Sequence, residues 1–120
     1  MEELAENITH EEVLELIQDF PLTPMRSKII ITVNVDEDED ELDLGGYGFS
    51  ATQYVLAVGS QNNVINAGDR VLLNLESMTE EISGPEGSSF SIKVKPIKVG
   101  DRIFALVTDG VVDAIDNREI

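Results

Sequence analysis

The chain has 120 residues, of which 42% are hydrophobic, and its formal net charge is −16. This length suits one domain with a modest core, and the hydrophobic content predicts a folded chain rather than a disordered one. The excess of carboxylates repels nucleic-acid phosphates, which excludes nucleic-acid binding. The chain has no cysteine, which excludes disulfides and thiolate metal sites. It also has no apolar run near the roughly 18 residues of a membrane span and no basic leader, so we expect no membrane association and a cytoplasmic protein.

The acidity is concentrated in two segments. Residues 1–20 carry seven acids and no lysine or arginine, and residues 36–43 carry seven more acids. The rest of the chain holds ten acids and all eight lysines and arginines, so it is nearly neutral. We therefore predict an acidic N-terminal helical extension over residues 1–20, followed by a single β-barrel domain over residues 21–120.

A short helix is predicted over residues 10–19. Thr9 and Glu12 have capping-box spacing, in which each side chain satisfies a free backbone amide of the other. The residue before Pro21 is pushed out of the helical region, which ends the helix. Apolar residues recur at helical spacing between these two signals: Val13, Leu14, Leu16 and Ile17.

From residue 28 onward the hydrophobic period changes to two, the period of a β-strand. The segments are rich in β-branched residues and are separated by Gly, Asn and Asp, which is typical of an all-β barrel or sandwich. Residues 76–89 are predicted to be a flexible loop because they end in a run of serine and glycine. The six expected strands are residues 28–35, 54–58, 71–75, 90–95, 103–107 and 111–115.

The sequence lacks the usual signatures of catalysis. His10 is the only histidine, and its place in the first turn of the expected helix makes it a solvent-exposed residue rather than a general base. There is no phosphate-binding glycine loop and no dinucleotide fingerprint. We therefore predict no enzymatic activity, no catalytic residue and no cofactor.

The acidic run does not fit a calcium loop. Asp36, Asp38 and Asp40 fall at positions one, three and five of an EF-hand register. Position six of that register requires glycine and position twelve requires glutamate, but this chain has Glu41 and Tyr47 there. The sequence therefore predicts no metal site.

Residues 36–52 are predicted to form a mobile loop. Neighbouring carboxylates repel one another and extend the chain, and the glycines that follow remove backbone preference. A disordered segment with a small apolar tip is typical of a motif that folds on binding, with its two aromatic residues as anchors. The alternative is that both aromatic residues pack back onto the barrel. The candidate partner-binding residues are Gly45, Gly46, Tyr47, Gly48 and Phe49.

Several short motifs follow one another in a recognisable order. They are a Pro-Leu pair before the first strand (residues 21–31), Gly-Gly before the Tyr-Gly-Phe tripeptide (45–49), Val-Leu-Ala-Val-Gly (55–59), Ala-Gly-Asp-Arg-Val (67–71) and Gly-Val-Val-Asp-Ala-Ile (110–115). In this order the chain resembles the GroES-like co-chaperonins, the chaperonin-10 family, over roughly residues 21–116. The resemblance implies a GroES-like β-barrel that assembles into a heptameric ring and caps an ATP-driven, GroEL-like chaperonin. It also implies that residues 47–49 dock on the large chaperonin ring and that the chain hydrolyses nothing.

The chain departs from that family in four places. The docking tripeptide of the family is usually aliphatic, and only eight residues separate Gly59 from Gly68, too few for the hairpin that roofs the ring in many members. The helix at residues 10–19 and the loop at 83–89 are additions. Such a trimmed version resembles a bacteriophage-encoded relative.

Two other classes of function remain open. One is a phage virion structural protein, such as a decoration or adaptor β-barrel, which has no chaperonin partner and uses the N-terminal helix as a docking arm. The other is an accessory domain of an enzyme.

Overall fold

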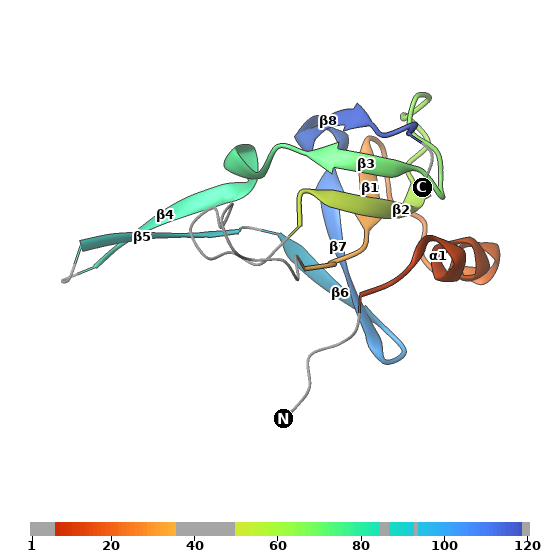
Figure 1. Ribbon diagram of the computed structural model, residues 1–120, viewed down its shortest axis with the longest axis horizontal. Helices are drawn as coiled ribbons and strands as arrows, with labels where there is room; N and C mark the ends of the chain where they lie inside the picture. Colours follow the sequence, from red (N-terminus) through yellow and green to blue (C-terminus); the bar gives the residue numbers. More distant parts are fainter. Residues whose placement is uncertain (1–6, 36–49, 85–86, 93, 119–120) are drawn as a thin grey trace.

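One antiparallel sheet forms the body of the protein (Figure 1). The computed structural model describes residues 7–35, 50–84, 87–92 and 94–118. Within these residues the six strands of the sheet are ordered β6-β7-β1-β2-β3-β8, and β4 and β5 form a separate two-stranded sheet. The strands are β1 (Lys28–Ile31), β2 (Thr52–Val58), β3 (Arg70–Leu73), β4 (Thr79–Gly84), β5 (Gly87–Ile92), β6 (Lys95–Val99), β7 (Arg102–Thr108) and β8 (Val112–Ile115).

The sheet is apolar on both faces. Ile29 and Ile31 belong to one buried cluster, whereas Ile30 belongs to another on the opposite face, because successive side chains of a strand point to opposite sides. The second cluster also contains Val13 and Phe104. This explains why the first strand is an uninterrupted apolar run. One face of the strand packs in the first cluster, and the other face is covered by the N-terminal helix.

The predicted N-terminal helix is confirmed. Helix α1 (His10–Leu16) continues into a one-turn 3₁₀ helix (Ile17–Asp19). Its capping box is present, with the Glu12 amide donating to Thr9 Oγ1 at 3.2 Å and the Thr9 amide donating to Glu12 Oε1 at 3.0 Å. The helix lies beside β2 (Figure 1) and places the fully buried side chain of Val13 against the sheet.

The structure differs from the sequence-based prediction between residues 76 and 92. A 3₁₀ helix (Leu75–Met78) leads into the β4–β5 hairpin, which projects away from the six-stranded sheet (Figure 1). The pairing runs from Thr79 opposite Ile92 to Gly84 opposite Gly87. Serine- and glycine-rich composition suggested a loop, but the two halves of the segment satisfy each other's backbone groups, and such pairing cannot be read from composition.

The predicted strand over residues 90–95 is also wrong. Strand β5 ends at Ile92 and β6 begins at Lys95, so the predicted span covers parts of two strands in different sheets. Pro96 lies within β6, and β6 is an edge strand, the position in a sheet where proline is tolerated. The all-β class with a short N-terminal helix is confirmed, and among the described residues no ladder joins the edge strands β6 and β8.

A helix that crosses a bilayer has to be long and apolar. In the part of the chain that the structure describes, no helix has both the length and the apolar character needed to cross a bilayer.

Candidate functional site

The predicted docking residues Gly45, Gly46, Tyr47, Gly48 and Phe49 lie outside the described residues. The structure does describe both ends of the segment that carries them. That segment, residues 36–49, joins the end of β1 to the start of β2, and these strands are neighbours in the sheet. The Ser50 amide donates to the Asn34 carbonyl at 3.0 Å, so the chain leaves and re-enters the sheet at one place. Strand β2 begins at Thr52, which shortens the predicted loop of residues 36–52 at its C-terminal end.

A buried glutamine fixes these two ends to each other. Gln53 Oε1 accepts from the Thr32 hydroxyl at 2.6 Å and from the Asn34 amide at 2.8 Å. Gln53 Nε2 donates to the carbonyls of Asn34 at 2.9 Å and Ser50 at 2.8 Å. All four hydrogen-bonding positions of the side-chain amide are therefore used, and Gln53 is 0% exposed.

The position of this glutamine follows from an irregularity in the sheet. The β1–β2 register shifts between Ile30 and Ile31, and the regular strand β1 ends at Ile31. Beyond that point Thr32 still bonds to Tyr54, through its amide at 2.9 Å and through its hydroxyl, which accepts from the Tyr54 amide at 3.0 Å. Farther along, the side chain of Gln53 takes the place of the backbone groups of a partner strand, so buried peptide groups stay hydrogen-bonded.

The N-terminal segment is hydrogen-bonded to the residues that precede segment 36–49. Asn7 Nδ2 donates to the Val35 carbonyl at 2.8 Å, and the Val35 amide donates to Asn7 Oδ1 at 3.0 Å. In the same way, the Ile8 amide donates to Asn34 Oδ1 at 2.9 Å, and Asn34 Nδ2 donates to the Ile8 carbonyl at 3.0 Å. We call the residues that surround the two ends of segment 36–49 the loop clasp: Asn7, Ile8, Asn34, Val35, Ser50 and Gln53.

A second polar cluster lies between β3 and the chain after β8. Asp116 accepts from Arg118 Nε at 2.9 Å and Nη2 at 2.8 Å, and its Oδ2 forms an ion pair with Arg70 Nε at 3.1 Å that lacks the alignment of a hydrogen bond. Hydrogen bonds from the side chain and amide of Arg118, followed by the contact with Arg70, hold the pKa of Asp116 far below its usual range. The Asp116 side chain is only 3% exposed, and its charge is matched by the two guanidinium groups, so this cluster ties the C-terminal segment to the sheet.

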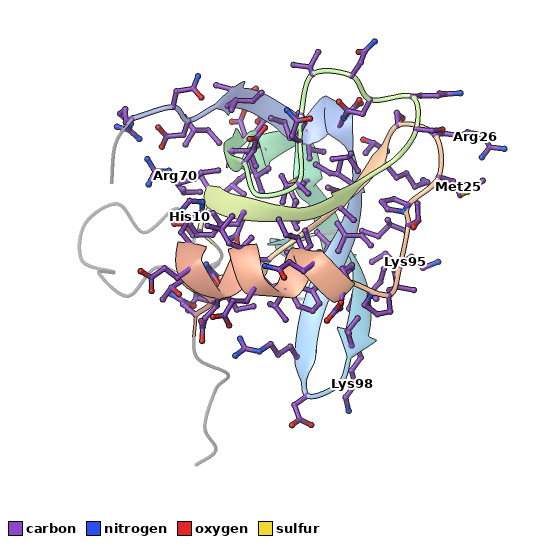
Figure 2. All side chains as sticks on the ribbon, turned by 90° about the vertical axis from the view of Figure 1, so that its right-hand side faces the viewer. His10, Met25, Arg26, Arg70, Lys95 and Lys98 are labelled. Carbon is purple, nitrogen blue, oxygen red and sulfur yellow. The ribbon has the colours of Figure 1, made fainter. Side chains whose placement is uncertain are left out.

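His10 lies beside that cluster, and Figure 2 shows it on the same side of the molecule as Arg70. Both line a pocket of about 160 Å³. The His10 ring stacks on Tyr54 with 5.3 Å between ring centroids. The histidine is half-buried rather than exposed as predicted. The described residues that line the pocket with it include no serine, threonine or cysteine.

A larger groove of about 520 Å³ runs between residues 61–65 and β8. Its polar lining includes Asn62, whose Nδ2 donates to Asp109 Oδ2 at 3.2 Å. Within the described ranges no three histidine, cysteine or carboxylate side chains gather as metal ligands. The groove therefore offers hydrogen bonds and some apolar surface to a bound molecule.

The loop clasp was not predicted from the sequence. Thr32 and Asn34 were assigned to one face of a longer strand, and Gln53 was not singled out. The available signal was the presence of amide and hydroxyl side chains inside otherwise apolar runs, because such groups are buried only where they find partners.

Comparison with known proteins leaves the family open. No protein-family model matches the sequence, and no curated protein is similar to it at a significant level.

Proposed function

We propose that the protein is a GroES-like co-chaperonin, which caps a GroEL-like, ATP-driven chaperonin ring through residues 36–49 and so assists protein folding. The observation that carries the proposal is the loop clasp. It holds the two ends of a 14-residue segment side by side on a buried amide network, with the Ser50 amide bonded to the Asn34 carbonyl at 3.0 Å. Anchoring of this kind suits a loop that presents a binding motif from a rigid sheet.

The arrangement of the other motifs also supports the proposal. Residues 21–31 lead into and include β1, residues 55–59 include most of β2, residues 67–71 lead into β3, and residues 110–115 include β8. These four strands are consecutive neighbours in the sheet. Motifs that are short and scattered in the sequence therefore belong to one contiguous structural unit.

In this proposal Tyr47 and Phe49 insert into an apolar groove of the chaperonin ring. Ordering a loop costs roughly 1–2 kcal/mol for each residue fixed, so one loop binds weakly. A heptamer presents seven tethered loops, and the first loop to bind raises the effective concentration of the others. The chain contributes binding and chamber closure, while the ring contributes ATP hydrolysis.

The test is capture of the protein by a GroEL-like ring in the presence of ATP. The double substitution Tyr47→Ala and Phe49→Ala removes both proposed anchors and is expected to abolish capture. A matched control is Met25→Ala with Val64→Ala, which truncates two apolar side chains that are 65% and 68% exposed elsewhere on the surface. The control should be captured as well as the wild type, and undiminished capture of the Tyr47/Phe49 variant would contradict the docking role.

Native mass spectrometry tests the assembly separately. A heptamer is expected for a chaperonin cap. A monomer or a trimer at micromolar concentration would argue for the virion or adaptor function instead.

A further inference from the structure

The groove of about 520 Å³ beside β8 follows the edge of that strand. Strand β8 lies at the margin of the sheet, beyond β3 (Figure 1). Ala114 and Ile115 pair with successive residues of β3, and both line the groove. Successive side chains of a strand point to opposite faces of the sheet, so a groove that both of them line runs along the strand edge rather than over one face. Residues 61–65 form its opposite wall.

The outer edge of β8 has backbone groups that β3 does not use. In an antiparallel pair, residues whose N–H and C=O point to the partner strand alternate with residues whose groups point away from it. The Asp116 amide donates to the Arg70 carbonyl at 2.7 Å, so the preceding residue, Ile115, directs its N–H and C=O away from β3. Strand β8 is the last in the order of the sheet, and no strand of the described residues pairs with this edge.

The groove has an apolar floor and an acidic rim. Val112 and Ile115 pack against the buried cluster of the sheet and form the floor. The rim carries Asp113, which is exposed, and Asp109, which is half-buried and accepts the hydrogen bond from Asn62. Among the described residues, no lysine or arginine lines the groove. Its charge is therefore complementary to a basic ligand.

The edge strand at the other end of the sheet has different chemistry. Strand β6 carries Lys95 and Lys98, and its Pro96 has no amide hydrogen to donate. Lysine and proline are residues with which proteins discourage the pairing of an edge strand, and β8 contains neither. A basic strand is repelled by the lysines of β6 and attracted by the carboxylates beside β8, so charge favours β8 for a basic ligand.

We propose that the edge of β8 binds an extended, basic peptide segment of a partner protein by strand addition. The backbone of the peptide bonds to the outward N–H and C=O of Ile115, and a lysine or arginine of the peptide lies beside Asp113. Its apolar side chains lie on the floor formed by Val112 and Ile115. Backbone pairing provides affinity without regard to sequence, and the acidic rim selects the charge of the peptide. This inference does not depend on the co-chaperonin function.

The test uses the full-length protein in about 150 mM NaCl, because salt screens the long-range attraction of any basic peptide to a chain of net charge −16. The probe is a fluorescein-labelled peptide of alternating valine and lysine, about seven residues long. One comparison peptide has glutamate in place of lysine. Two others are valine–lysine peptides in which alternate amides are N-methylated, one for each edge of the peptide. Fluorescence anisotropy measures binding.

We expect the valine–lysine peptide to bind with a Kd below about 1 mM and the glutamate peptide not to bind. One N-methylated peptide should lose binding and the other should keep it, because an added strand pairs through only one of its two edges. Absence of binding by the valine–lysine peptide at about 1 mM, or equal binding of the lysine and glutamate peptides, would overturn the proposal. The same behaviour of the two N-methylated peptides would exclude strand addition and overturn it as well.

The variant Asp113→Lys locates the site by reversing the charge of the rim. Its matched control is Glu15→Lys, which makes the same change of charge at an exposed residue of α1 outside the groove. Far-ultraviolet circular dichroism and the urea midpoint establish that each variant is folded. Asp113→Lys should weaken binding of the valine–lysine peptide about fivefold or more, and Glu15→Lys less than about twofold. Equal weakening in the two variants would mean general attraction to an acidic protein and would contradict the site.

Hydrogen exchange at the Ile115 amide tests the site in the wild type without a substitution. At a peptide concentration about ten times the Kd, exchange at Ile115 should slow about tenfold, while the amides of β6, the other edge strand, keep their rates. Unchanged exchange at Ile115 with the peptide bound would overturn the proposal. Slow exchange at Ile115 in the free protein would mean that this chain or a second copy already covers the edge, and it would also overturn the proposal.

Discussion

The backbone carbonyl of Arg26 lies where a side chain at Gly59 would begin. A β-carbon at position 59 would collide with that carbonyl group, so only glycine fits. The contact is held by two hydrogen bonds, from the Gly59 amide to the Lys28 carbonyl at 2.9 Å and from the Gln61 amide to the Arg26 carbonyl at 3.0 Å. Arg26 itself has a φ of 58°, in the left-handed region. The last glycine of the Val-Leu-Ala-Val-Gly motif is therefore required by the entry into β1.

Substitution Gly59→Ala should destabilise the fold by about 3 kcal/mol, because the added methyl group meets backbone atoms that cannot move without disturbing both strands. The free energy of unfolding in urea measures the effect. The matched control is Gly110→Ala, where the nearest atom to a β-carbon would be Thr108 Oγ1 at 3.7 Å. The control should change stability by less than about 0.5 kcal/mol, and equal losses in the two variants would refute the steric argument.

Helix α1 should contribute to stability through one buried side chain. Val13 is 0% exposed and Leu14, its chain neighbour, is 43% exposed. Val13→Ala removes two buried methyl groups and is expected to cost about 2 kcal/mol, whereas Leu14→Ala should cost about 0.5 kcal/mol. Chemical denaturation of both variants checks the difference. A larger loss for Leu14→Ala would mean that the helix rests on the sheet through its other face.

The ion pairs of Asp116 should give the protein a specific acid sensitivity. Its folded-state pKa lies far below the usual carboxylate value near 3.9, because Arg118 and then Arg70 stabilise the charged form. A depressed pKa contributes stability above the unfolded-state pKa, and that contribution is lost as the pH falls from about 4 toward the folded-state value.

Asp116→Asn should therefore be less stable than the wild type at pH 7, and the difference should shrink as the pH is lowered below about 4. Urea midpoints of the two proteins, measured in parallel from pH 7 to about 2.5, give that difference directly. Comparing the pair at each pH cancels the titration of the many other carboxylates. A difference that stays constant over the whole range would show that Asp116 acts through packing rather than charge.

The edge strand β6 should depend on its lysines for solubility. Lys95 and Lys98 are exposed on this edge strand and extend outward in Figure 2. Charged side chains on an edge discourage pairing with another chain. Replacing both with valine is expected to cause concentration-dependent aggregation, measured by light scattering. Replacing both with glutamine loses the same charge but keeps polarity, and it should aggregate far less; similar aggregation of the two variants would contradict this role for the edge.

Local signals predicted the elements that depend on local chemistry. The capping box at Thr9 and the apolar spacing after it predicted α1, and alternation predicted the centres of β1, β2, β3, β7 and β8. The predicted first strand ran to Val35, whereas β1 ends at Ile31, because Gln53 replaces the backbone partner beyond that point. That replacement joins residues 19 positions apart, and no local pattern encodes it.

The bounds of hairpin β4–β5 and strand β6 were not predicted correctly from local signals. These segments mix polar with apolar residues, and each forms a strand because of the partner that it meets, as with Pro96 opposite Ala105. The docking residues predicted from the sequence remain a prediction, and the structure adds to them the loop clasp at which their segment is held.

The order of strands in the sheet has a consequence for synthesis on the ribosome. Strands β7 and β8 follow each other in the chain, separated by a single 3₁₀ turn at Asp109–Val111, yet β7 lies between β6 and β1 while β8 lies beyond β3. Until residues 102–115 emerge from the exit tunnel, β1 lacks its second neighbour and β3 lacks its outer one. A nascent chain that has already made β1, β2 and β3 therefore keeps two apolar edges open until β7 and β8 have followed, and only then can it complete its own core.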